Sequence, residues 1–169
     1  AARERAASGG GAALLEVSRV RRVFGGIVAL DDVSFAVERG AAVGLIGPNG
    51  AGKTTLFNLL TGVERPSAGA ILLDGTRIDG VAPHRIARLG VGRTFQSVRA
   101  FGDLTVRDNL RIALMSAPRD DSGESDARIL AALEQADMAA HVDADAGLLS
   151  YGQRKLVELA MVLVQSPRL

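Results

Sequence analysis

The chain has 169 residues, of which 47% are hydrophobic, which suffices for one packed domain or for most of a larger one. Its net charge of +1 gives no electrostatic argument for a nucleic-acid groove, and the absence of cysteine excludes disulfides, thiolate metal sites and thiol catalysis. No apolar stretch approaches the ~20 residues that cross a bilayer. Residues 1–13, rich in Ala, Gly and Ser, predict a flexible leader.

The first half of the chain has the pattern of short strands alternating with turns and helices. Strands are predicted at residues 14–20, 29–37, 42–46, 70–73 and 91–95, the third of them buried. Helices are predicted at residues 53–60 and 83–89. Gly25-Gly26 and Asp74-Gly75 mark turns between strands.

The second half changes to a helical period. Apolar residues recur at helical spacing in two groups: Val106, Leu110, Ala113 and Leu114, and then Ile129, Leu130, Leu133 and Ala136. A polar, acidic link at residues 118–125 separates them, and a last helix is predicted from Ser150 to about Gln165. Strands followed by mixed and then helical blocks indicate an α/β core with a helical subdomain inserted.

One glycine-rich loop carries the strongest functional signal. Residues 47–54 read Gly-Pro-Asn-Gly-Ala-Gly-Lys-Thr and match G-x-x-x-x-G-K-[ST], the loop that wraps nucleotide phosphates, between a predicted strand and a predicted helix. Glycines let backbone N–H groups turn inward, and the helix start near Gly52 attracts anions. Lys53 is expected to reach the terminal phosphates and Thr54 to hold Mg²⁺. The predicted nucleotide contacts are Gly47, Pro48, Asn49, Gly50, Ala51, Gly52, Lys53, Thr54 and Thr55. An ordinary glycine turn is the alternative, and the full match in this context disfavours it.

A second motif, residues 149–153, reads Leu-Ser-Tyr-Gly-Gln at the start of the last helix. Ser150 is a good N-cap, and its hydroxyl with free N–H groups of Gly152 and Gln153 would form an anion site. Taken alone, the motif would more often be simple capping. Together with the phosphate loop, it resembles the ATP-binding subunits of ABC transporters, whose Leu-Ser-Gly-Gly-Gln signature covers the ATP of the opposite subunit. Tyr151 replaces the first signature glycine.

The resemblance covers about residues 14–169. It implies an α/β, P-loop NTPase (RecA-like) core, with an N-terminal antiparallel β subdomain and an α-helical subdomain inserted at about residues 104–160. It also implies ATP and Mg²⁺ as cofactors, Thr54 and Gln96 as metal contacts, catalytic roles for Lys53 and Gln96, and an adenine-stacking role for Phe24. Without the resemblance, Gln96 would be read as a solvated surface residue, and Phe24 equally well as a core or edge-strand aromatic.

Two segments, residues 24–35 and 83–96, and the signature tyrosine resemble importers of branched-chain amino acids and of urea or short amides. That branch implies a peripheral location on the cytoplasmic face of the membrane, a second ABC ATPase subunit, membrane permeases and an extracytoplasmic solute-binding protein. The alternatives are a non-transport ABC ATPase switch and an inactive nucleotide-binding fragment. Co-purification with permeases would separate the first alternative from an importer.

The chain departs from the family pattern in three ways. Met161 stands where the family usually has arginine, and residues 115–149 are fewer than is typical. The chain also ends at Leu169, before the Walker B strand with its aspartate and catalytic glutamate and before the switch histidine, so the C-terminal part of the core is missing. We therefore expect no steady-state hydrolysis and marginal stability from these 169 residues alone.

Overall fold

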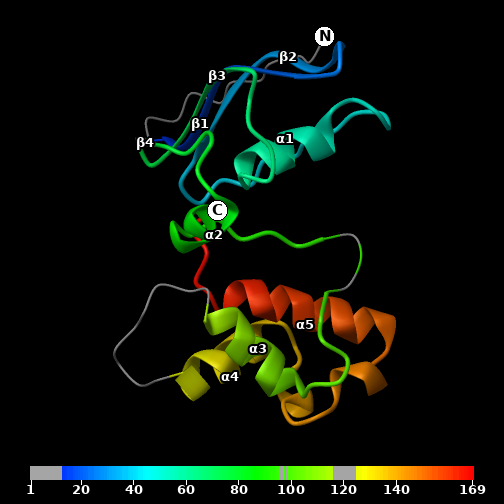
Figure 1. Cartoon of the computed structure of the whole chain (residues 1–169). Coiled ribbons are helices and arrows are strands. Elements are labelled where there is room, and N and C mark those ends of the chain that lie inside the picture. Colours follow the sequence, from blue (N-terminus) through cyan, green and yellow to red (C-terminus); the bar gives the residue numbers. More distant parts are fainter. Residues whose placement is uncertain (1–12, 96, 98, 116–124) are drawn as a thin grey trace. The chain divides into compact units, whose positions relative to one another are not determined.

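The structure is a computed structural model that describes residues 13–95, 97, 99–115 and 125–169. The chain divides into two compact units, Ala1–Ala82 and Pro83–Leu169, each of which is described by itself (Figure 1). Within the described ranges, no helix is both long and apolar enough to cross a bilayer. Residues 1–12 of the predicted leader lie outside the described residues, and Ala13, its last residue, begins the first strand.

The first unit contains a four-stranded antiparallel sheet in the order β2-β1-β3-β4 (Figure 1). The strands are β1 (Ala13–Phe24), β2 (Ile27–Glu38), β3 (Ala68–Leu73) and β4 (Thr76–Arg77). They confirm the strands predicted near residues 14–20, 29–37 and 70–73. Gly25 and Gly26 join β1 to β2 with φ values of +47° and +90°, as a two-residue hairpin with positive φ at both positions requires.

The predicted helix after the glycine loop is also present, as α1 (Lys53–Leu60). Leu56, Leu59 and Leu60 are its buried residues, at the i, i+3 and i+4 spacing of one helical face. The first residue of α1 is Lys53, so the last glycine of the loop is the helix N-cap.

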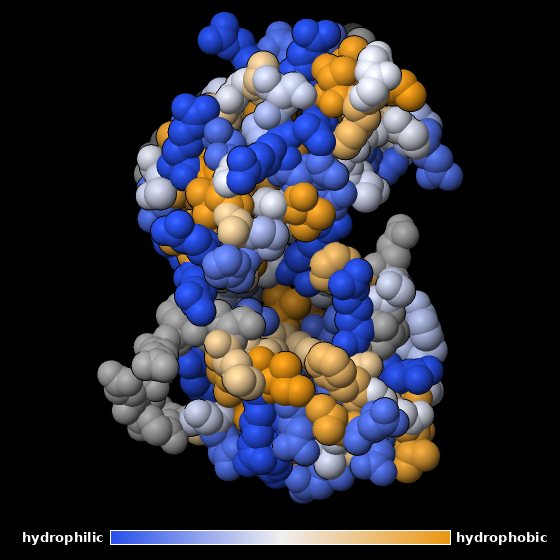
Figure 2. All heavy atoms as spheres, viewed as in Figure 1, coloured by the Kyte–Doolittle hydropathy of each residue, from blue (hydrophilic) through white to orange (hydrophobic). Residues whose placement is uncertain are grey.

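The buried strand predicted at residues 42–46 is wrong. Residues 41–48 form no strand with any part of the chain that the structure describes, and Val43, Leu45 and Ile46 are exposed, Ile46 at 95%. An apolar strand of this kind needs neighbouring strands for its backbone groups and covering layers for its side chains. The described residues supply neither. Apolar side chains also lie on the surface elsewhere in both units (Figure 2).

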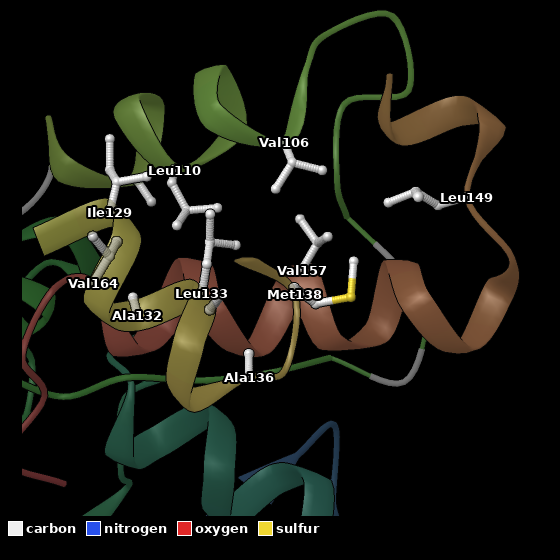
Figure 3. Packing of buried hydrophobic residues seen from close by; sticks show 12 residues of the cluster. Val106, Leu110, Ile129, Ala132, Leu133, Ala136, Met138, Leu149, Val157 and Val164 are labelled. Carbon is white, nitrogen blue, oxygen red and sulfur yellow. The ribbon is translucent and has the colours of Figure 1, made fainter. Parts of the chain in front are cut away.

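The second unit is helical. It comprises α2 (Pro83–Arg88), α3 (Val106–Leu114), α4 (Ser125–Gln135), two short 3₁₀ turns, η1 (Ala139–His141) and η2 (Ala146–Leu148), and α5 (Tyr151–Leu163). Side chains from α3, α4 and α5 share one core (Figure 3). The core includes Val106, Leu110, Ala113, Ile129, Leu133, Val157 and Ala160. The helical periods predicted for this half are confirmed except at Leu130, which is 41% exposed. Residues 118–124 of the predicted link lie outside the described residues, and its last residue, Ser125, begins α4.

The strand predicted at residues 91–95 is wrong, because these residues form no strand in the structure. The first of them, Val91, nevertheless lies beside Leu169 in a backbone pairing. Gly92 N–H donates to the Leu169 carbonyl at 2.8 Å, and Leu169 N–H donates to the Gly90 carbonyl at 3.1 Å. These two bonds are the pattern of a parallel bridge between Val91 and Leu169. Among the described residues, none continues this ladder along positions 93–95.

Candidate functional site

The glycine loop is held against the second strand of the sheet. Gly50 and Gly52 have φ values of +83° and +86°, which side chains with a Cβ rarely adopt. A Cβ on Gly52 would lie 2.5 Å from the Ala29 carbonyl oxygen and 2.8 Å from Leu30 Cδ2. The loop therefore approaches the backbone of β2 so closely that only glycine fits at position 52.

The lysine of the loop folds back over it. Lys53 Nζ donates hydrogen bonds to the carbonyl oxygens of Gly47 at 2.6 Å and Pro48 at 2.7 Å. An ammonium group can donate three hydrogen bonds and prefers anionic acceptors, so it lies where phosphate oxygens bound by the loop would compete for it. The structure thus places the Lys53 ammonium group against the first two residues of the loop, and its contact with terminal phosphates stays a prediction.

Two threonines follow Lys53 in the chain, and Thr54 is the one predicted to hold Mg²⁺. Thr54 is exposed and Thr55 is half-buried in the first turn of α1. Among the described residues, no group of three or more His, Asp or Glu side chains could hold a metal ion. Mg²⁺ at nucleotide sites takes few protein ligands and several phosphate and water oxygens, so a single threonine hydroxyl fits that ion.

Phe24 ends β1 at the hairpin and is 39% exposed. The Arg22 guanidinium carbon lies 4.2 Å from the centre of its ring, in a cation–π contact. Arg22 is fixed in turn by Glu64, with Nη2 and Oε2 2.5 Å apart. The ring is thus held on one side by a guanidinium that is itself anchored, and nothing in the sequence motif indicates this support.

The signature segment caps α5 as predicted. Ser150 Oγ accepts from Gln153 N–H at 3.3 Å, and Gln153 Oε1 accepts from Ser150 N–H at 2.9 Å, which together make a capping box. The expectation of a free Gln153 N–H is wrong, because the serine hydroxyl takes it. Gly152 remains exposed, and a Cβ there would meet nothing within 4 Å, so its side of the helix start is open.

One residue supporting the signature was missed from sequence. The ring Nε2 of His141, in η1, lies 2.7 Å from Gln153 Nε2. Gln153 therefore uses its oxygen on the cap and its nitrogen on His141, and its side chain is fixed at both atoms. Nothing in the spacing of residues 141 and 153 in the sequence points to this contact.

Two buried polar side chains in the second unit were also missed, Asn109 and Glu158. The Asn109 amide accepts from Phe101 N–H at 2.7 Å and donates to the carbonyls of Phe101 and Thr105, so it holds the loop that enters α3. Both residues interrupt the apolar face of a predicted helix, and a polar residue in that position is the signal that would have found them.

Gln96, the predicted metal contact and catalytic residue, lies outside the described residues.

Comparison with known proteins places these features in a family. Residues 30–169 match the ABC transporter family. The high-affinity branched-chain amino acid transport ATP-binding protein BraF of Pseudomonas aeruginosa is 41% identical over 170 residues, which cover 92% of this chain and 67% of BraF. The spermidine/putrescine import ATP-binding protein PotA of Chromobacterium violaceum is 41% identical over 157 residues, covering 93% of this chain and 42% of PotA.

The fold agrees with solved ATP-binding cassettes. The ADP conformation of MJ1267, an ATP-binding cassette of an ABC transporter, superimposes with a TM-score of 0.81 at 32% identity and covers 92% of this chain and 66% of that one. The chain thus spans about two thirds of the length of BraF and of MJ1267. The α/β, P-loop NTPase fold predicted from the two motifs is confirmed. The chain belongs to the ABC transporter family.

Proposed function

We propose that this chain is the nucleotide-binding part of an ATPase subunit that powers an ABC importer. The observation that carries the proposal is the phosphate loop, in which Gly52 packs on the backbone of β2 and Lys53 Nζ lies 2.6 Å and 2.7 Å from two loop carbonyls. A loop built this way presents backbone N–H groups and one cation to phosphates. Family membership assigns those phosphates to ATP.

The other site residues take roles consistent with this ligand. Phe24 offers a partly exposed ring to the adenine, the Thr54 hydroxyl and the Gln96 amide bind Mg²⁺, and Gln96 orients the attacking water. When bound, Mg²⁺ would supply positive charge that neutralises the phosphates during transfer to water. Ser150 and Gly152 bind the ATP held by a second ATPase subunit, at the open start of α5.

In this account ATP binding closes two ATPase subunits face to face, and closure moves the membrane permeases. The subunit lies on the cytoplasmic face of the membrane, and an extracytoplasmic protein delivers the solute. Branched-chain or other hydrophobic amino acids are the proposed solutes, because BraF, a branched-chain amino acid transport ATP-binding protein, is 41% identical over 92% of this chain, and residues 24–35 and 83–96 resemble the same branch. Urea or short amides are the second candidate, from the resemblance of residues 24–35 and 83–96.

Uptake in the cell tests this function. Deleting the gene for the protein should abolish uptake of labelled leucine or valine, and the wild-type gene should restore it. A gene carrying Lys53→Ala should not restore it, while Arg88→Ala, which removes an exposed cation from α2, should. Loss of urea uptake alone would select the second solute class. Normal uptake of both solutes in the deletion strain would favour a non-transport ABC ATPase.

A further inference from the structure

The signature helix α5 holds the backbone of Phe95, the residue directly before Gln96. Glu158 Oε1 accepts from Phe95 N–H at 3.0 Å, and Lys155 Nζ donates to the Phe95 carbonyl oxygen. The two side chains also pair with each other, with Lys155 Nζ 3.0 Å from Glu158 Oε2. The backbone N–H and the backbone carbonyl of Phe95 are thus both hydrogen-bonded to side chains that lie one helical turn apart on α5. We name this arrangement the Phe95 clamp.

Burying the charged Glu158 of the clamp costs free energy, which argues that this side chain does more than fill space in the core. Glu158 is only 5% exposed, and a buried carboxylate is unfavourable unless each oxygen has a strong partner. One of its oxygens takes the backbone N–H and the other the ammonium. Its neighbours Val157 and Ala160 are buried in the apolar core of the same unit, where an apolar side chain suffices.

The side chain of Phe95 is fixed as well. The guanidinium carbons of Arg93 and Arg99 lie 4.8 Å and 4.0 Å from the centre of its ring. Burial, followed by repulsion from Arg99, lowers the pKa of Arg93. Two like charges at one ring oppose each other, and the ring face attracts both. Phe95 is therefore held at its backbone by α5 and at its ring by its own loop.

We propose that Lys155 and Glu158 are positioning residues for Gln96. They hold the main chain of Phe95 against α5, the helix that begins after the signature serine. A change in the orientation of α5 would therefore move Phe95, the residue to which Gln96 is attached. The clamp gives the signature helix a direct mechanical link to the residue that orients the attacking water. The inference rests on the proposed function, because Gln96 has that task only in an ATP hydrolase.

A double-mutant cycle on kcat tests the link, with the complete subunit assembled with its partner subunits and permeases. Lys155→Ala should lower kcat roughly tenfold or more, since small displacements of a positioning group cost that much, while the affinity for Mg-ATP changes less than about twofold. In a Gln96→Ala background, the same substitution should lower kcat no further. Lys155→Arg keeps a cationic donor and should retain most of the wild-type kcat.

Two controls separate positioning from general damage. Arg111→Ala removes a half-exposed cation on α3 of the same unit and should leave kcat unchanged. Hydrogen exchange at the Phe95 amide should accelerate in Glu158→Ala and stay unchanged in Glu134→Ala, an exposed carboxylate on α4. This second readout needs no catalysis, so it also decides the case in which Lys155→Ala loses structure.

The outcomes are distinguishable. Equal kcat losses from Lys155→Ala with and without Gln96, or unchanged exchange at Phe95 in Glu158→Ala, would overturn the clamp and leave the proposed function intact. A wild-type assembly that binds no Mg-ATP and hydrolyses none would overturn the proposed function, and the clamp's role with it.

Discussion

At the scale of single residues, two glycines of the phosphate loop are required for different reasons. Gly50 and Gly52 both have positive φ, but only at Gly52 would an added Cβ also meet a backbone oxygen, at 2.5 Å. Gly50→Ala should cost about 1–2 kcal/mol of unfolding free energy, the penalty of a left-handed backbone for a residue with a Cβ. Gly52→Ala should cost more, because the loop must also leave β2. Urea denaturation of both variants compares them directly, and equal losses would mean that the contact with Ala29 does not constrain the loop.

Asp79 gives the first unit an acid-sensitive contact. Burial raises the pKa of Asp79, but hydrogen bonds from the Arg77 side chain and the Ile71 N–H outweigh it, and the net shift is downward from 3.8. A carboxyl with a lowered pKa in the folded state stabilises fully above 3.8, and that stability is lost as the pH falls through the folded pKa.

The variant Asp79→Asn should therefore be less stable than wild type at pH 7, and the difference should shrink as the pH is lowered below about 4. Thermal unfolding at a series of pH values measures it, with the exposed Asp103→Asn as the control substitution. A difference between wild type and Asp79→Asn that stays constant down to about pH 2 would contradict the ionic role of this carboxyl.

At the scale of elements, the packing of α3, α4 and α5 supports the signature helix. Leu133 of α4 is fully buried in the shared core (Figure 3). Leu130, three residues earlier, is 41% exposed. Leu133→Ala should cost about 2–5 kcal/mol of unfolding free energy, and Leu130→Ala should cost much less. Chemical denaturation followed by helical circular dichroism gives both values. Similar costs for the two variants would place the core on the wrong face of α4.

Most elements that the sequence predicts correctly have their partners close in the chain or carry their own start signals, and β3, which pairs with the distant β1, is the exception. The hairpin at Gly25-Gly26 joins two adjacent strands, and α1 and α5 carry their own start signals in Gly52 and Ser150. Residues 42–46 have an equally strong apolar pattern and residues 91–95 a weaker one, with Arg93 and Thr94 in it, but a pattern says only that a segment suits burial. Whether it becomes a strand depends on partner strands, and the described residues offer only Leu169.

The residues of the candidate site also fall into those that the sequence predicts and those that it does not. The phosphate loop and the signature cap were predictable because each is a contiguous motif whose chemistry follows from its own residues. The contacts of Arg22 with Glu64, of His141 with Gln153 and of Glu158 with Phe95 join residues 42, 12 and 63 positions apart. No local pattern encodes such pairs. A contact of this kind is indicated in the sequence only where a polar or charged residue stands within an apolar helix face, as Asn109 and Glu158 do.

At the scale of the whole molecule, the residues to which we assign roles are divided between the two units. The first holds the phosphate loop and Phe24, and the second holds the signature and the Phe95 clamp. In the proposed function, the signature binds the nucleotide held by the opposite subunit, so the two units need not act on the same ATP. Ser150→Arg should accordingly leave ATP binding intact but prevent ATP-dependent pairing with the second subunit, as measured by light scattering or gel filtration. Pairing equal to wild type would remove Ser150 from that interface.

The proposed ATPase function depends most directly on the phosphate loop binding the phosphates of ATP through Lys53. Titration of the protein with Mg-ATP, followed by calorimetry, tests this, with Lys53→Ala as the variant and Arg88→Ala as the control for loss of an exposed cation. Removing a charged hydrogen-bond donor should weaken Mg-ATP binding roughly 10- to 100-fold in Lys53→Ala, whereas Arg88→Ala should bind as wild type does. Equal Mg-ATP affinities of wild type and Lys53→Ala would contradict the proposed function.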